Sequence, residues 1–101
     1  MPNIVNDWLI TMPAGVNNPH GLIFSSGHWW VSFETSPGVV ARIDPASPST
    51  YSLITFAGHT WGMDLIENPL NGKVLVVWQG GAVVSEIDPT TLAWTDVISG
   101  T

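Results

Sequence analysis

The sequence predicts an all-β protein of the β-propeller class, with two four-stranded blades in the chain and an additional N-terminal strand. The first observation behind this prediction is an internal repeat of about 42 residues, which marks one structural unit that stacks on copies of itself. The second is that each copy divides into four short apolar runs separated by Gly, Pro, Asn and Ser. The copies run from Pro19-His20-Gly21-Leu22 to Ile43-Asp44-Pro45 and Gly58, and from Thr60-Trp61-Gly62-Met63 to Ile87-Asp88-Pro89 and Gly100.

The chain begins with a strand that has two later relatives. Residues 8–15 resemble residues 51–58, and residues 94–100 are a third version of the same strand. The chain therefore holds three copies of one strand type and two copies of everything else. We divide it into an N-terminal outer strand at 1–15, a first blade at 16–58 and a second blade at 59–101.

Each blade is predicted to contain four strands in the same order. Turn residues mark their boundaries; Asn71-Gly72, for example, suits a hairpin turn that requires positive φ. The second strands are apolar at successive positions, which is typical of strands covered on both faces, and sheets covered in this way are the blades of a propeller. The expected strands are 21–25, 29–34, 39–43 and 51–56 in the first blade, and 63–66, 73–78, 82–87 and 94–98 in the second.

Composition narrows the choice of partners. The 101 residues carry a formal net charge of −6, with only Arg42 and Lys73 opposing the acids, so no basic face is expected to bind nucleic acid or an anionic membrane. The absence of cysteine excludes a disulfide framework. No basic and apolar leader opens the chain and no apolar run approaches about 18 residues. We therefore expect a soluble chain without a signal peptide or transmembrane segment, and leave its compartment open.

Two blades alone leave two broad apolar faces uncovered, and a monomer rarely exposes that much apolar surface. Cyclic association of identical chains covers both faces, because each chain offers one face to the next. Three chains give six blades and four give eight; we favour the trimer over the tetramer. Residues 8–15 then lie beside a neighbour's second blade, near residues 92–100 of that neighbour.

His20 and Glu34 are the histidine and carboxylate pair that this arrangement brings to one face. Repeated around a ring, the pair is a candidate site for a divalent cation or for proton transfer. The structural alternative is that the His20 ring bonds a backbone carbonyl at a turn. Asp64, on the strand nearest the propeller axis, is a further candidate metal ligand, and a solvated acid lining the channel is the alternative there.

His59, Trp61 and Gln79 are predicted to lie on the same face as His20. An aromatic ring in a loop with polar neighbours is a typical platform for a carbohydrate. The structural alternative is that Trp61 packs in the space between blades. These residues are therefore candidate ligand contacts rather than catalytic groups.

Three other polar residues are interpreted as structural. His28 is predicted to lie in a hairpin turn on the opposite face. Asp44 and Asp88 each precede a proline where a third strand ends, and an aspartate at such a place accepts backbone N–H bonds within the turn.

The first repeat resembles a blade of the streptogramin B lyase-like (virginiamycin B lyase-like) propellers and, more loosely, NHL-type repeats. The residues that carry the resemblance are Pro19-His20-Gly21-Leu22, Trp29-Trp30-Val31-Ser32-Phe33-Glu34 and Arg42-Ile43-Asp44-Pro45, and the similarity extends over 16–100. It implies a propeller with a metal-assisted active site of His and Glu side chains, onto which His20 and Glu34 map. The second repeat has Trp61 and Gln79 at these places, and the family has seven blades, which chains of two blades do not reach by repetition.

The sequence favours a self-assembling propeller that serves as a binding or structural assembly module, with a carbohydrate or a protein as its ligand. A component of a virus particle is one setting that suits a short self-assembling chain. The first alternative is a lyase-like enzyme in which His20 is the general base and Glu34 orients it or a metal. The second is a fragment of a larger or engineered propeller without activity of its own. A divalent cation is the one cofactor considered.

Overall fold

The computed structural model describes residues 10–80 and 83–100, and it confirms the all-β prediction. These residues form two four-stranded antiparallel sheets and no helix. It follows that no helix of the described residues is long and apolar enough to cross a membrane. The first sheet contains β1 (Pro19–Ser25), β2 (His28–Phe33), β3 (Gly38–Ile43) and β4 (Tyr51–Phe56), and the second contains β5 (Gly62–Glu67), β6 (Val74–Trp78), β7 (Val83–Ile87) and β8 (Trp94–Ser99).

Both sheets are simple meanders in which each strand pairs with the next one along the chain. Turn chemistry ends the strands where the sequence predicts. Gly72 has a φ of 73°, so the Asn71-Gly72 turn has the positive φ that was expected. The aspartates of the Asp-Pro pairs accept backbone bonds: Asp44 Oδ1 from Ala46 N, and Asp88 Oδ1 from Thr90 N and Thr91 N. These bonds also hold the pKa of Asp88 below its ordinary value, with the Thr91 bond as the largest cause.

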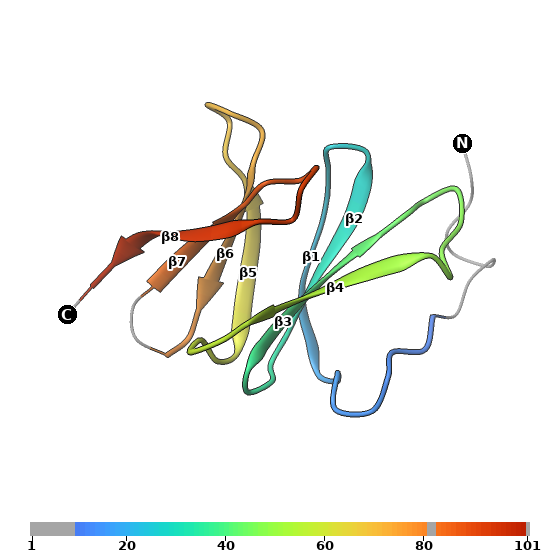
Figure 1. Cartoon of the computed structure of the whole chain (residues 1–101), viewed down its shortest axis with the longest axis horizontal. Helices are drawn as coiled ribbons and strands as arrows, with labels where there is room; N and C mark the ends of the chain where they lie inside the picture. The colour runs from blue at the N-terminus through green and yellow to red at the C-terminus, as the bar shows by residue number, and fades with distance from the viewer. Residues whose placement is uncertain (1–9, 81–82, 101) are drawn as a thin grey trace.

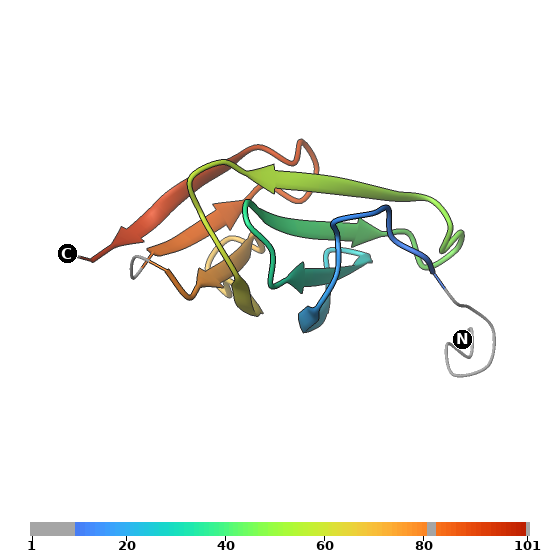
Figure 2. The same ribbon diagram turned by 90° about the horizontal axis from the view of Figure 1, so that it is seen from below.

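The two sheets pack face to face, with β1 beside β5 and the outer strands β4 and β8 farthest along each meander (Figures 1 and 2). Two buried tryptophans anchor this core. Trp30 donates its indole N–H to the carbonyl of Ser25, and Trp78 donates its indole N–H to the hydroxyl of Ser85. The buried core residues are Trp30, Val40, Ile54 and Phe56 from the first sheet, and Leu65, Val74, Val76, Trp78 and Ile87 from the second.

Each sheet has a second, apolar face that is turned away from its partner, and we call these the free faces. On the first sheet, strand alternation puts Leu22 on the free face, because its neighbour Ile23 packs against the core between the sheets. On the second sheet it puts Ile66 there, because Leu65 is buried in that core. The first free face carries Leu22, Phe24, Trp29, Val31, Phe33, Val39, Ala41, Ile43 and Tyr51, and the second carries Ile66, Leu75, Val77, Val84, Glu86 and Ile98.

The predicted N-terminal strand at 8–15 is not formed in the single chain, as far as the structure describes it. Residues 10–13 have no regular structure and Ala14-Gly15 form a turn, whereas residues 8 and 9 lie outside the described residues. Instead, Ile10, Met12 and Val16 pack on the free face of the first sheet. A strand needs a hydrogen-bonded neighbour, and the segment lies on a sheet face, where no strand edge is available.

Strand register corrects the alignment of the two repeats at their first strands. Pro19 lies opposite Phe33, and Gly62 lies opposite Trp78, so Pro19 and Gly62 are equivalent. The equivalent of Trp61 is therefore Asn18, which shares its left-handed backbone, with φ of 59° and 54°. The prediction that Trp61 stands where His20 would be is wrong by two residues.

Gly38 gives a test of the packing between the sheets. A Cβ added at Gly38 would lie 2.1 Å from Cζ3 of Trp78, so Gly38→Ala must displace a fully buried indole. We expect the variant to lower the free energy of unfolding by about 1–3 kcal/mol or more in urea denaturation. Trp78→Leu should cost less in the Gly38→Ala background than in the wild type, because the clash is then removed. A Gly38→Ala protein as stable as the wild type contradicts this packing.

Candidate functional site

Four loop segments that the sequence predicts on one face are joined there by backbone hydrogen bonds. Glu34 N donates to Asn18 O at 2.9 Å, Trp61 N to Thr35 O at 3.0 Å, and Gln79 N to Trp61 O at 3.0 Å. A further bond runs from Gly38 N to His59 O at 2.7 Å. We call this surface the loop face; it comprises residues 16–20, 34–38, 59–61 and 79–80.

His20 ties the two sheets together through its ring. Its Nδ1 lies 2.5 Å from the carbonyl oxygen of Met63, and because a carbonyl only accepts, Nδ1 carries the proton. This is the bond to a backbone carbonyl that was the structural alternative for His20. The remaining ring nitrogen, Nε2, has no hydrogen-bond partner among the described residues and belongs to an exposed side chain.

The structure places His20 and Glu34 on the same face, but their side chains are not bonded to each other. Both belong to the loop face, yet no hydrogen bond or ion pair joins their side chains within the described structure. No group of three or more His, Asp or Glu side chains is placed to hold a metal ion in 10–80 and 83–100.

Asp64 lies away from the loop face. It is exposed and sits on the free face of the second sheet, opposite Val77 in the register of β5 and β6. His28 lies in the first hairpin, as predicted, where its Nδ1 is 3.0 Å from the carbonyl oxygen of Ser26. Neither residue joins the cluster formed by the loop segments.

His59 contacts two tryptophan rings and an aspartate. Its ring is stacked on Trp78, with centroids 5.5 Å apart, and meets Trp94 edge-on at 5.5 Å. Its Nε2 lies 2.8 Å from Oδ1 of Asp96 in β8. His59 therefore links the connection between the two sheets to the last strand, rather than standing free beside Trp61 as a ligand contact.

Asp96 is the end of a chain of hydrogen bonds that starts at a buried indole. Trp78 Nε1 donates to Ser85 Oγ at 2.9 Å, and Ser85 Oγ donates to Asp96 Oδ1 at 2.8 Å. The Ser85 bond is the largest cause that holds the pKa of Asp96 below its ordinary value of 3.8. Desolvation opposes it, and the bond and the charge of His59 each lower the pKa further. Since Asp96 stands between Ser85 and His59, the histidine does not contact the serine hydroxyl, and the three residues lack the direct serine–histidine bond of a nucleophile and base pair.

Trp61 remains exposed on the loop face, and this sets it apart from the other large aromatic residues nearby. Its side chain is 48% exposed, whereas Trp30 and Trp78 are buried. Its backbone has a positive φ of 59°, which is uncommon for a bulky residue. Gln79 is also exposed, and it lies beside Trp61 because its backbone N–H donates to the carbonyl of Trp61. Within the chain, Trp61 does not pack between the sheets; Trp78 has that role.

Comparison of the chain with protein-family models, curated proteins and solved structures finds no match. Its function is therefore inferred from its own geometry. Sequence reasoning placed His59 and Trp61 on one face, but it missed Asp96 and Ser85. The available signal was weak: Asp96 and Ser85 are polar residues in two predicted strands that otherwise are largely apolar.

The pKa of Asp96 predicts a loss of stability in acid. Because its folded-state pKa is depressed, the ionised group stabilises the fold above the ordinary carboxyl pKa, and that contribution is lost as the pH falls through the folded value. Asp96→Asn should lower the free energy of unfolding by less than about 1 kcal/mol at pH 7, since Asp96 is 40% exposed. The difference from wild type should shrink below about pH 4.

Denaturant unfolding between pH 3 and 7 measures this difference. Asp64→Asn is the matched control, because Asp64 is an exposed carboxylate to which no side-chain hydrogen bond is donated within the described structure. A difference between Asp96→Asn and the wild type that is constant over this range contradicts a role for the charge.

Proposed function

We propose that the chain supplies two adjacent blades of a β-propeller and that identical chains complete the ring. Three copies, giving six blades, are favoured, and four copies are the second choice. The assembled ring acts as a structural or binding module, with its ligand held on the loop face. The observation that carries this proposal is that one apolar sheet face is already buried by a sheet of the same design, while two equivalent faces are left without such a cover.

The contact between the two sheets is the template for the contact between chains. Phe33 on the free face of the first sheet is equivalent in register to Trp78, which the first sheet covers within the chain. Ile23, which packs on the second sheet, is equivalent to Ile66, which is exposed. A free second sheet from one chain and a free first sheet from the next therefore repeat the packing inside the chain.

The charges of the free faces are compatible with this contact. The free face of the first sheet is apolar, and Leu22 and Phe24 on it are 60% and 54% exposed. The free face of the second sheet carries two acidic residues, Asp64 and Glu86. Asp64 is exposed on β5, whereas Glu86 accepts bonds from Asn68 and Asn71 at 3.0 and 3.2 Å. The charge of Glu86 is therefore satisfied within its own chain, and a partner need not supply a cation for it.

The resemblance to streptogramin B lyase-like and NHL-type repeats supports the propeller as the architecture. It supports the activity of that family less, because His20 donates to a backbone carbonyl and no bond joins it to Glu34 in the described chain. We therefore propose a module that assembles and binds rather than one that catalyses a reaction.

Solution mass tests the ring. Size exclusion coupled to light scattering should give three times the chain mass of 10.9 kDa for the trimer. Leu22→Asp should give the mass of one chain, because it places a charge in the centre of the proposed contact. The matched control is Leu70→Asp, since Leu70 is 92% exposed in the turn between β5 and β6 and belongs to neither sheet. A wild-type protein that stays monomeric at millimolar concentration contradicts the proposal.

Trp61 tests the ligand on the loop face. If the exposed indole stacks on a sugar ring, at least one member of a glycan panel should quench the tryptophan fluorescence of the wild-type protein. Trp61→Gly should abolish this quenching without lowering the free energy of unfolding, because glycine adopts the positive φ at this position without strain. Quenching that persists in Trp61→Gly, or none with any glycan, contradicts a carbohydrate site at Trp61.

A further inference from the structure

The segment before β1 repeats the end of β4 and the turn that follows it. Val16 N donates to Pro13 O at 3.1 Å, just as His59 N donates to Phe56 O at 3.1 Å. Val16 then packs on the cluster that contains Phe33, as His59 packs on Trp78. The segment therefore follows the path by which a chain leaves the outer strand of one sheet and reaches the next. The glycines of the two turns also share left-handed backbones, with φ of 87° at Gly15 and 85° at Gly58.

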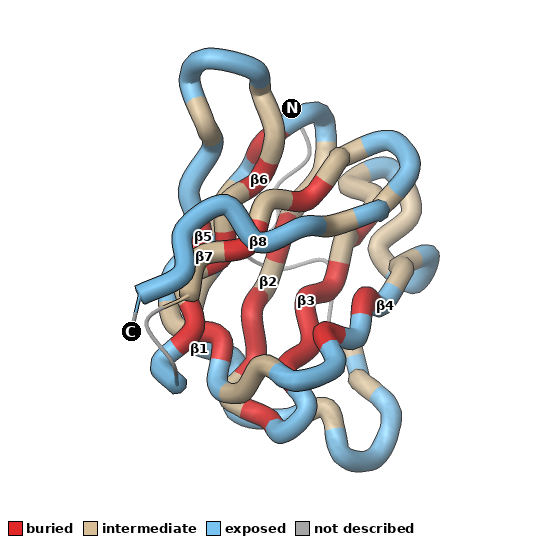
Figure 3. The backbone as a smooth tube through the Cα atoms, turned by 60° about the vertical axis from the view of Figure 1, so that its left-hand side comes forward, coloured by how far each residue is buried: buried red, intermediate tan, exposed pale blue. Residues whose placement is uncertain are grey.

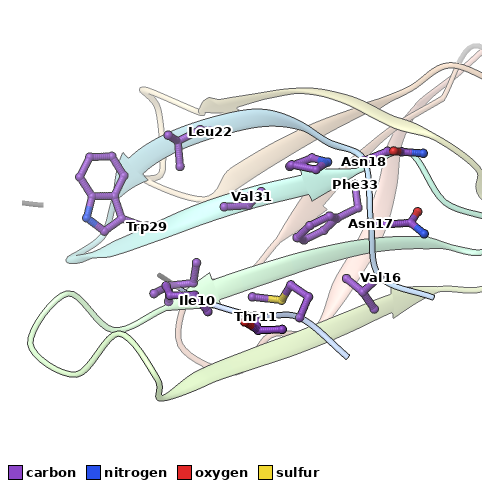
Figure 4. Close-up of a pocket in the computed structure, with 12 residues that line it drawn as sticks. Ile10, Thr11, Val16, Asn17, Asn18, Leu22, Trp29, Val31 and Phe33 are labelled. Carbon is purple, nitrogen blue, oxygen red and sulfur yellow. The ribbon is translucent and has the colours of Figure 1, made fainter. Parts of the chain in front are cut away.

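Ile10 and Met12 lie where the outer strand of a preceding sheet would cover the first sheet. They pack on the cluster of Phe33, Val39, Ala41 and Ile43. The fit is loose: a cleft of about 580 Å³ remains between the segment and the sheet, as Figure 4 shows. The segment therefore covers only part of this apolar face and leaves the rest of it open. The cleft is lined by Ile10, Thr11, Met12, Val16, Asn17, Asn18, Pro19, Leu22, Trp29, Val31, Phe33 and Ile43.

The strand that fits this place belongs to another copy of the chain. Ile98 in β8 pairs with Val84, as Ile54 in β4 pairs with Val40, so the two isoleucines are equivalent. Ile54 is 7% exposed because it packs on the second sheet, whereas Ile98 is 58% exposed. Figure 3 shows β8 exposed along most of its length. Ile98 is thus an exposed apolar side chain at a position that, in the first sheet, is covered by a neighbouring sheet.

We propose that residues 10–12 are a displaceable cover, which in the separate chain occupies the place that β8 of the preceding copy takes in the ring. This inference rests on the proposed ring. The docked copy brings the free face of its second sheet onto the free face of the first sheet, with Ile98 replacing Ile10 and Met12. Association therefore requires the cover to leave, and the cover shields the apolar face of the separate chain from other partners.

The overlap with the strand β8 itself is confined to the residues before Pro13. Ser99 pairs with Val83 as Thr55 pairs with Val39, so β8 ends one position before the equivalent of Phe56. The turn at Pro13 is in turn the equivalent of the turn that starts at Phe56. The β8 strand of the preceding copy therefore ends where the Pro13 turn begins. β8 therefore displaces residues 10–12 and does not itself reach Pro13 to Val16.

Weakening the cover should strengthen self-association. The double variant Ile10→Ser with Met12→Ser reduces the apolar contact of the cover and leaves the sheet unchanged. We expect its monomer–oligomer midpoint concentration, measured by sedimentation velocity, to fall about tenfold relative to the wild type. Deletion of residues 1–12, which keeps the Pro13 turn, should act in the same direction. Leu70→Ser is the control for an exposed apolar residue elsewhere and should leave the midpoint unchanged.

The outcomes separate this inference from the proposed ring. If the wild type assembles and the double variant assembles equally well or more weakly, the cover is refuted and the ring stands. Weaker assembly of the double variant shows, in addition, that the segment takes part in the contact between chains. If neither assembles at any concentration, the ring is refuted and the cover with it. Near-ultraviolet circular dichroism establishes that the variants are folded, and the double variant decides the question if the deletion precipitates.

Discussion

The structure depends on one constraint: a sheet that is apolar on both faces must be covered on both. β2 and β6 each place apolar side chains on both sides of their sheet, so neither sheet is complete as a single layer. Packing the first sheet on the second satisfies one face of each. The repeat makes the remaining two faces equivalent to the pair already joined, so the interaction that builds the chain is also the one through which we propose that chains meet.

The contact between the sheets depends on glycines, because the indole ring of Trp78 lies where a larger side chain at Gly38 or Gly62 would collide with it. Gly38 and Gly62 both approach the indole of Trp78, and a Cβ at either position would meet the ring at 2.1 and 3.2 Å. The indole N–H then needs a buried acceptor, which Ser85 supplies, and the Ser85 hydroxyl needs one in turn, which Asp96 supplies. His59 closes this chain of polar groups at the loop face. A packing requirement at the centre thus leads, bond by bond, to the one bonded histidine and carboxylate pair of the described structure.

The strands were predictable because local patterns determine them: apolar runs between turn residues predict all eight strands of the described chain to within about two residues. The residue-by-residue equivalence of the first strands of the two sheets, β1 and β5, was not predictable in this way. Matching Gly21 to Gly62 by letter is natural, but each glycine is required by a different contact, Gly21 by Ser32 and a carbonyl of β5, and Gly62 by Ser32 and Trp78. The bond between His59 and Asp96 joins the connection between the two sheets to β8, which are distant in the sequence and which only the packing of the sheets brings together.

The loop face and the free faces divide the roles of assembly and binding between different parts of the chain. Association through the free faces uses the sides of the sheets, whereas the loop segments lie at their ends and are held by backbone bonds within one chain. Trp61 therefore keeps its exposed, left-handed position without help from a neighbour. His20 differs, because its exposed side chain has no group of further candidate metal ligands around it within the described residues. A sugar bound at Trp61 would thus be recognised by one chain, with the ring adding avidity, whereas a metal at His20 would depend on the ring itself.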